Sequence, residues 1–340
     1  MENRLSGISL LRIVATISVI ALHTAGTVTT AVPQLEGGMF TFFNLITIAF
    51  CWAVPVFFMI TGSLLLNPRK ELTASKCVKK YALRMVLALF IFGIPFALLM
   101  LIFNQGAFSP VMLIDSVLAV FTGDTFAHLW YLYVLVGIYL ILPVLRAFVK
   151  NAPKKDIQII LAVLFLLDFI LPTVSAYTGL SFEFSIPFTY PVFYLFTGYY
   201  VSSYKPAVLR NRALNTAVIL LLTAAVFIMG YNNIPLHCFS YTGPLTAVMA
   251  AAMFSNFAAC AGNDKPAHSE LIWKIDRLCF GAYLIHPVFI QFAYRFLKFT
   301  PASFEMYYIA IIPFFIAFTI CSFVASWIMS LIKPLRKYVL

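Results

Sequence analysis

One arginine and three histidines stand inside apolar stretches of this sequence. Arg12 and His23 share the stretch LLRIVATISVIALHTAG. His128 opens the stretch HLWYLYVLVGIYLILPVL, and His286 lies within GAYLIHPVF. An ionisable group inside a membrane helix is costly unless it is paired or faces a watery cavity. Each of these four residues is therefore a candidate for binding or catalysis.

Arg12 and His23 are predicted to lie on nearly the same face of one helix. The eleven steps between them amount to three turns plus about 20°, over roughly 16 Å of helix axis. A neutral imidazole can take a proton from a hydroxyl, so His23 is the candidate general base, with Arg12 as its catalytic partner. In the structural alternative, Arg12 extends to the lipid headgroups and His23 hydrogen-bonds a neighbouring helix.

His128 and His286 are the candidates for binding an acceptor substrate. Trp130 and Tyr131 follow His128, and aromatic faces beside a polar donor suit a sugar, although they also suit an aromatic belt at the membrane interface. Pro287 follows His286. A proline disturbs the backbone hydrogen bonds of a helix and often opens a kink where a polar group can bind, but helix packing explains this position equally well.

The elements that position these residues are membrane helices. The chain has 340 residues, of which 62% are hydrophobic and 10% charged, with a mean hydropathy of +0.96. Soluble domains have about 45–50% apolar and about 25% charged residues. We therefore predict an all-α, polytopic transmembrane helix bundle that forms a single domain over residues 1–340. About ten spans are predicted, at 8–29, 40–66, 81–103, 127–148, 157–173, 186–203, 213–230, 239–261, 279–297 and 305–332.

The basic residues predict how these spans are oriented. The net charge is +11, and 20 of the 23 Lys and Arg residues fall before the first span, after the last, or in alternate connections. The only basic residues in the opposite connections are Arg295 and Lys298, which stand there with five acidic residues. By the positive-inside rule both termini are cytoplasmic. The orientation of the spans in the membrane explains most of the net positive charge. We therefore expect the lipid bilayer as a partner, and we expect no nucleic acid.

Several other classes of site are not indicated. The six cysteines show no CxxC spacing, so neither a disulfide framework nor a metal site is predicted. No phosphate loop of the Walker type and no nucleophile elbow is present. The apolar stretch 107–122 contains Asp115 and is short. We interpret it as an interfacial or re-entrant helix, because a further span there would invert every later charge assignment.

The order of motifs resembles the membrane-bound acyltransferase-3 family. Arg12-x10-His23 is followed by PVFFMITGSLLL (55–66), a basic loop, HLWYL (128–132) and GAYLIHPV (281–288). The resemblance covers essentially the whole chain. It is strongest to stand-alone sugar O-acetyltransferases such as the enterobacterial common antigen type.

The resemblance implies an acyltransferase of the bacterial cytoplasmic membrane. Its members move an acyl group, usually acetyl from cytoplasmic acetyl-CoA, to a hydroxyl of a cell-surface or lipid-linked glycan. Arg12 and His23 match the essential pair of the family. No permanently bound cofactor is expected. Direct transfer and a covalent relay through His23 both fit.

The predicted donor site departs from the family pattern at one position. The family commonly has two arginines three residues apart at the start of the third span, and here Tyr81 and Arg84 occupy those positions, with Lys79 and Lys80 beside them. Lys79, Lys80 and Arg84 are predicted to bind the phosphates of acetyl-CoA, although a lysine lacks the planar fork of arginine. The alternative is that these charges only set the topology.

A transporter or exporter of a glycan or small metabolite is the second hypothesis, because related ten-span membrane domains have been linked with export. Release of free coenzyme A thiol distinguishes the two functions.

Overall fold

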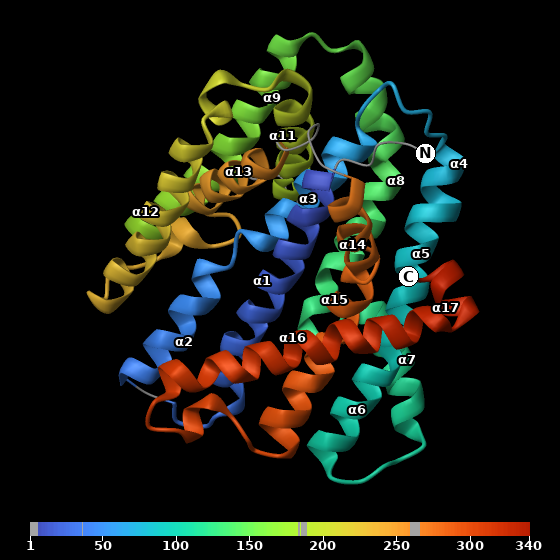
Figure 1. Cartoon of the computed structure of the whole chain (residues 1–340), viewed down its shortest axis with the longest axis vertical. Helices are drawn as coiled ribbons and strands as arrows, with labels where there is room; N and C mark the ends of the chain where they lie inside the picture. The colour runs from blue at the N-terminus through green and yellow to red at the C-terminus, as the bar shows by residue number, and fades with distance from the viewer. Residues whose placement is uncertain (1–5, 36, 183, 185–188, 259–265) are drawn as a thin grey trace.

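The computed structural model describes residues 6–35, 37–182, 184, 189–258 and 266–340. Within these residues all regular structure is helical (Figure 1). The α-helices are α1 (Ser6–Ala31), α2 (Gly37–Ala49), α3 (Ala53–Leu65), α4 (Ala74–Lys76), α5 (Leu83–Ala88), α6 (Ile94–Gln105), α7 (Val111–Thr122), α8 (Trp130–Asn151), α9 (Lys154–Phe165), α10 (Leu171–Thr178), α11 (Tyr190–Tyr204), α12 (Arg212–Tyr231), α13 (Pro244–Ala258), α14 (Pro266–Asp276), α15 (Cys279–Gln291), α16 (Tyr307–Leu331) and α17 (Lys333–Tyr338).

Shorter helical segments connect or extend these helices. The π-helical segments are η1 (Cys77–Ala82), η2 (Leu89–Gly93), η4 (Leu166–Ile170) and η7 (Phe292–Phe296). The 3-10 segments are η3 (Ala127–Leu129), η5 (Ala207–Arg210), η6 (His237–Phe239) and η8 (Pro301–Ser303).

Seven helical stretches of the described residues are long and apolar enough to cross a membrane. They are Gly7–Ala31, Gly37–Leu65, Ala74–Gln105, Val111–Asn151, Lys154–Thr178, Arg212–Tyr231 and Tyr307–Leu331. The helical fold and the membrane location follow from them, and they overlap seven of the ten predicted spans.

The other three predicted spans form shorter helices. Spans 186–203, 239–261 and 279–297 correspond to α11, α13 and α15 with η7; residues 186–188 and 259–261 lie outside the described residues. Many residues of these helices are buried among other helices. The number of ten spans and the cytoplasmic termini therefore stay predictions.

The predicted span 40–66 coincides with the helical stretch Gly37–Leu65, which a turn divides into α2 and α3. Residues 50–52 form a turn between α2 and α3, with a hydrogen bond of 3.1 Å from the Ala53 amide to the Phe50 carbonyl. Pro55 lies in the first turn of α3. Because proline has no amide hydrogen to donate back along the chain, it fits well in the first turn of a helix.

The segment predicted as interfacial or re-entrant contains α7. Its 12 residues extend about 18 Å, less than the hydrocarbon layer of about 30 Å. It packs beside α6 (Figure 1). One face exposes Val111, Ile114 and Phe121, while Met112 and Val120 are buried. The interfacial or re-entrant interpretation of this segment stays a prediction.

Two glycines bring α3 and α11 into backbone contact. A Cβ on Gly62, within the PVFFMITG motif, would overlap the carbonyl oxygen of Leu195, and a Cβ on Gly198 would overlap that of Met59. Small residues permit such close approach between membrane helices. The motif glycine therefore fixes how α3, which lines the cavity described below, packs in the bundle.

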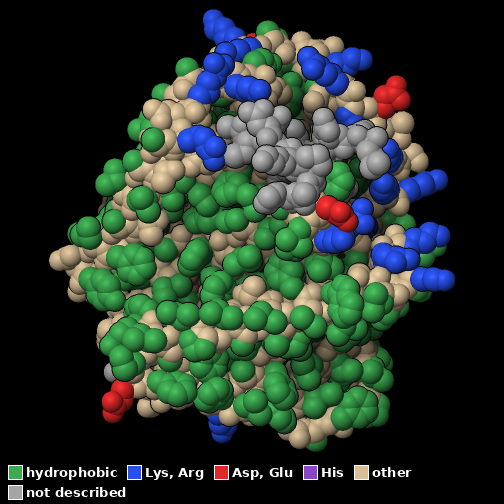
Figure 2. All heavy atoms as spheres, viewed as in Figure 1, with side chains coloured by type: hydrophobic (Ala, Val, Ile, Leu, Met, Phe, Trp, Pro, Cys, Tyr) green, Lys and Arg blue, Asp and Glu red, His purple; other side chains and the backbone are tan. Residues whose placement is uncertain are grey.

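The face shown in Figure 2 carries most of its charged side chains toward one end. In Figure 2, Lys and Arg side chains gather at one end of the face shown, and hydrophobic side chains cover most of the remainder. On α16, Ile312, Ile316 and Ile320 are exposed, whereas Phe314 and Phe318 are buried. An apolar stripe that faces outward is what contact with lipid requires.

Helices α1 and α15 run parallel through the bundle. Arg12 of α1 contacts Asp276, just before α15 begins, and His23 contacts His286 of α15. One residue further along α1, the carbonyl of Thr24 accepts a hydrogen bond from Tyr294 in η7. This pair of helices therefore carries the candidate residues in the same order from the charged end inward.

Candidate active site

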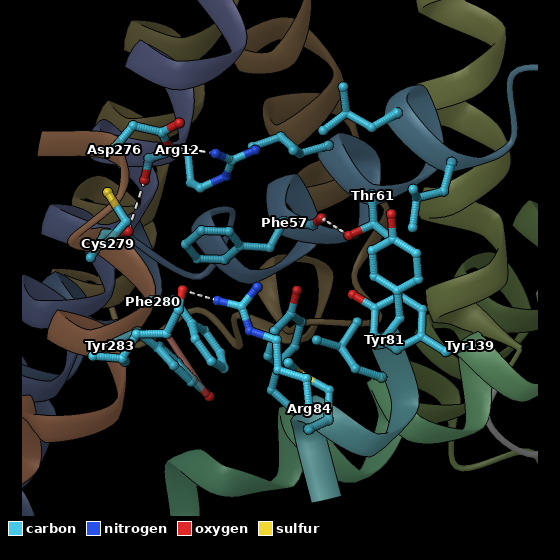
Figure 3. Close-up of a pocket in the computed structure, with 18 of the residues that line it drawn as sticks. Arg12, Phe57, Thr61, Tyr81, Arg84, Tyr139, Asp276, Cys279, Phe280 and Tyr283 are labelled. Atoms are coloured by element: carbon cyan, nitrogen blue, oxygen red, sulfur yellow. Dashed lines mark hydrogen bonds and ion pairs between the residues drawn. The ribbon is translucent and has the colours of Figure 1, made fainter. Parts of the chain in front are cut away.

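A cavity of about 410 Å³ lies beside the N-terminal parts of α1 and α15 (Figure 3). Basic residues from four parts of the chain line it, and tyrosines and phenylalanines form much of the rest of its wall. We call it the basic cavity. Its basic lining residues are Arg12, Lys70, Arg84 and Arg277, and its aromatic ones are Phe57, Tyr81, Tyr131, Tyr139, Phe280 and Tyr283.

Arg12 is held by an acid that the sequence analysis did not single out. Its Nη1 lies 2.5 Å from Oδ1 of Asp276, the last residue of α14. The hydroxyl of Ser9 donates to the other carboxylate oxygen at 2.9 Å. The side chain of Asp276 is 3% exposed and that of Arg12 is 29% exposed. The pair therefore fixes the guanidinium at the edge of the cavity while part of it stays accessible.

Arg84 is the predicted donor-site residue that lines the basic cavity. Its guanidinium donates to the backbone oxygens of Val339, at 2.6 Å, and Leu340. It also lies 5.3 Å from the ring centroid of Phe280. A planar cation stacked on an aromatic ring and bonded through two nitrogens has a defined orientation.

Lys79 and Lys80 are on the preceding turn but do not line the cavity. Both side chains are exposed, and the Lys80 ammonium lies 5.9 Å from the ring centroid of Tyr81. Tyr81, beside these lysines, does line the cavity. A ligand bound in the basic cavity would meet these lysines only with a part that extends outside it.

The three histidines singled out in the sequence meet in one cluster. The ring centroid of His23 lies 5.1 Å from that of His286 and 6.3 Å from that of His128, and His128 and His286 are 5.3 Å apart. They come from α1, η3 and α15. His128 and His286 are buried, whereas His23 is partly exposed. We call these three residues the histidine cluster.

The hydrogen bonds of two cluster members define their tautomers. Nδ1 of His286 lies 2.6 Å from the carbonyl oxygen of Tyr283, and Nε2 of His128 lies 3.3 Å from that of Leu284. A carbonyl only accepts, so each of these nitrogens carries the hydrogen. The other nitrogens, His286 Nε2 and His128 Nδ1, are buried without a hydrogen-bond partner among the described residues. Each therefore presents a lone pair within the cluster.

Tyr283 joins the cluster to the basic cavity. It lines the cavity, and its ring centroid lies 5.5 Å from that of His128 and 6.0 Å from that of His286. Its hydroxyl donates to the backbone oxygen of His128. His23 itself does not line the cavity, and Tyr283 contacts both the cavity and the other two histidines of the cluster.

Of the aromatic residues predicted to bind an acceptor, Tyr131 lies at this wall and Trp130 does not. Tyr131 lines the basic cavity, and its ring lies 5.8 Å from that of Tyr283. Trp130 packs instead against Tyr241, with ring centroids 6.0 Å apart. No group of His, Cys, Asp or Glu among the described residues is arranged to hold a metal ion.

A family model described as an acyltransferase domain, that of acyltransferase-3, matches residues 5–331. The chain belongs to the membrane acyltransferase-3 family. No curated protein and no solved structure matches the chain significantly. Family membership identifies the chain as a membrane acyltransferase, with an acyl donor and an acceptor as its substrates.

In this acyltransferase-3 member the structure brings together most of the residues singled out in the sequence. Arg12, Arg84 and Tyr131 line one cavity, and His23, His128 and His286 form the adjoining cluster. The roles assigned to these residues stay predictions. Sequence reasoning missed Asp276 and Tyr283; the tyrosine stands three positions before His286, a spacing that puts both on one face of a helix.

Proposed function

We propose that this acyltransferase moves an acetyl group from cytoplasmic acetyl-CoA to a hydroxyl of a cell-surface or lipid-linked glycan. The protein resides in the bacterial cytoplasmic membrane, and His23 is the general base. One observation carries the proposal: the parallel helices α1 and α15 put a basic cavity and the histidine cluster in series, with Tyr283 between them.

The basic cavity is the donor site. Acetyl-CoA carries phosphates, and arginine and lysine side chains bind phosphate through charge-assisted hydrogen bonds. Arg12 and Arg84 line the cavity, and the exposed Lys79 and Lys80 extend the positive charge outside it. The thioester arm lies along α1 toward His23, which is about 16 Å from Arg12 along the helix axis.

The histidine cluster is the reaction site. His23 takes the proton from the acceptor hydroxyl as its oxygen attacks the thioester carbonyl carbon. The new C–O bond forms, the C–S bond breaks, and the sulfur of coenzyme A leaves with the proton returned by His23. His128 and His286 hold the acceptor, since each has a lone pair that can accept from a second hydroxyl. A relay through an acyl-histidine has the same overall balance.

The test uses the purified full chain in lipid nanodiscs, isotope-labelled acetyl-CoA, and lipid-linked glycans extracted from a bacterial envelope. We expect His23→Ala to reduce transfer of label by at least about 100-fold, as the loss of a general base does. His237→Ala is the matched control, because His237 is exposed and outside the cluster. A folded His23→Ala variant that transfers label at the wild-type rate overturns the assignment of the base.

The same preparation distinguishes transfer from transport. An acyltransferase releases free coenzyme A thiol in proportion to labelled glycan, whereas a transporter consumes no acetyl-CoA. Release of thiol without label in any glycan would contradict a glycan as the acceptor. If neither free thiol nor labelled glycan appears, acetyl-CoA is not the donor.

A further inference from the structure

A second cavity, of about 470 Å³, lies at the other ends of α1 and η7. Its wall contains Thr30 and Ala31 from the end of α1 and Tyr294 and Arg295 from η7. Thr30 is seven residues beyond His23, about 10 Å along the helix axis. We call this the distal cavity; the histidine cluster lies between it and the basic cavity.

Two basic residues line the distal cavity. They are the two that the sequence predicts on the side of the membrane opposite both termini. Arg295 and Lys298 line it, and none of the described residues that line it is acidic. Nε of Arg295 is buried and has no hydrogen-bond partner among the described residues. A buried donor of this kind costs free energy until an acceptor binds to it.

Hydroxyl groups complete the polar part of the wall. Thr30, Thr300 and Ser303 line the cavity. Oγ1 of Thr300 and Oγ of Ser303 are 3.3 Å apart, and Thr300 is buried. Two cations beside several hydroxyls match an oxyanion that is attached to a hydroxyl-bearing ligand.

Tyr294 links this cavity to the reaction site. It lines the distal cavity, and its hydroxyl donates to the backbone oxygen of Thr24 at 3.1 Å. Thr24 directly follows His23. A ligand in the distal cavity is therefore close to the base along α1, on the side away from the donor cavity.

We propose that the distal cavity binds an oxyanion of the acceptor through Arg295 and Lys298, so that the acceptor is an acidic glycan. This inference rests on the proposed function, because that function makes the ligand the acceptor. The oxyanion is a carboxylate on a sugar or a phosphate that links the glycan to its carrier. Arginine binds both through paired hydrogen bonds.

The test measures binding directly, without transfer. The full chain in phosphatidylcholine nanodiscs is titrated with methyl glucuronide, glucose 1-phosphate and the neutral methyl glucoside, followed by ligand-observed NMR. We expect the anionic sugars to bind at least about tenfold more tightly than the neutral one. The tighter of the two identifies carboxylate or phosphate. Equal binding of all three overturns the proposal.

The variants assign the site. Arg295→Gln and Lys298→Gln should each raise the Kd of the anionic sugars at least about tenfold, the effect expected of one lost charged hydrogen bond. Arg295→Lys should retain part of the binding. Lys205→Gln is the matched control, because Lys205 is exposed and has a positive φ of 44°, close to the 51° of Lys298. Unchanged binding in folded Arg295→Gln overturns the proposal.

Two further arms separate the sources of failure. If phosphatidylglycerol in the nanodiscs abolishes sugar binding, the cavity is a site for lipid headgroups and the proposal fails. Arg84→Gln should leave sugar binding unchanged while it weakens coenzyme A binding. If Arg295→Gln transfers acetyl to a glycan at the wild-type rate, this inference fails and the proposed function stands. Sugar binding through Arg295 in a protein that does not bind coenzyme A would overturn the proposed function and would leave the distal cavity as an anion site whose ligand is not an acceptor.

Discussion

Asp276 and Arg12 form an ion pair of 2.5 Å at the mouth of the basic cavity. Asp276 ends α14, and α15 begins three residues later. The pair therefore ties the start of α15 to α1, which are the two helices that carry the histidine cluster. A charge buried to this degree needs a partner, since an uncompensated carboxylate in a protein interior is strongly destabilising.

Asp276→Asn should reduce both stability and transfer. The variant keeps the shape but removes the charge, so Arg12 loses the partner that orients it, and we expect a loss of about 1–3 kcal/mol in the free energy of unfolding. Thermal unfolding and label transfer measure the two effects. Glu270→Gln is the matched control, because it breaks the exposed pair with Lys274 on the same helix, and exposed pairs contribute little. Equal effects of the two variants would contradict the role of Asp276.

The sequence predicted individual site residues better than their contacts. Arg12 and His23 stand out because an ionisable side chain is rare in an apolar stretch, and helical periodicity puts them on one face. Asp276 lies between spans, next to Lys274 and Arg277, where an acid is ordinary. The cluster with His128 and His286 depends on how three distant segments pack, which no local pattern specifies.

The fold shows the same division. Apolar length predicts the helices, but the turn at residues 50–52 and the contact between Gly62 and the backbone of α11 are features of packing. Helices α11 and α13 correspond to predicted spans and have many buried residues. Apolar composition alone does not distinguish burial in protein from contact with lipid, so these two spans stay predictions.

Gly62→Ala should destabilise the bundle. The added Cβ would overlap the carbonyl oxygen of Leu195, and α3 and α11 must separate to admit it. Overpacking of this kind costs about 1–3 kcal/mol. Gly137→Ala in α8 is the control, because nothing lies within 4 Å of a Cβ there. Thermal unfolding in nanodiscs should show a lower Tm for the first variant alone; equal Tm values would contradict the close approach.

Tyr283→Phe should slow transfer while coenzyme A binds as before. The variant keeps the ring at the cavity wall but removes the hydroxyl that donates to the backbone of His128. The loss of one such bond costs about 1 kcal/mol and frees η3 to move relative to α15. The readout is a lower kcat with unchanged Kd for coenzyme A. Tyr231→Phe, at an exposed tyrosine, is the control and should change neither quantity.

Substitutions at the donor end should separate the cavity arginine from the exposed lysines. Arg84→Gln removes a guanidinium that lines the basic cavity, so the Kd of coenzyme A should rise at least about tenfold, as expected when a charged hydrogen bond is lost. Lys79→Gln and Lys80→Gln should each raise it less, because these side chains are exposed and solvent screens their charge.

The salt dependence of coenzyme A binding tests why Arg84 should contribute more to binding than Lys79 and Lys80. Added salt should reduce the contribution of Lys79 and Lys80 more than that of Arg84, since a partly buried contact is screened less than an exposed one. Arg212→Gln, an exposed arginine that does not line the cavity, is the matched control. If the lysine variants weaken coenzyme A binding more than Arg84→Gln does, the phosphates bind outside the cavity and the thioester arm enters it without help from Arg84.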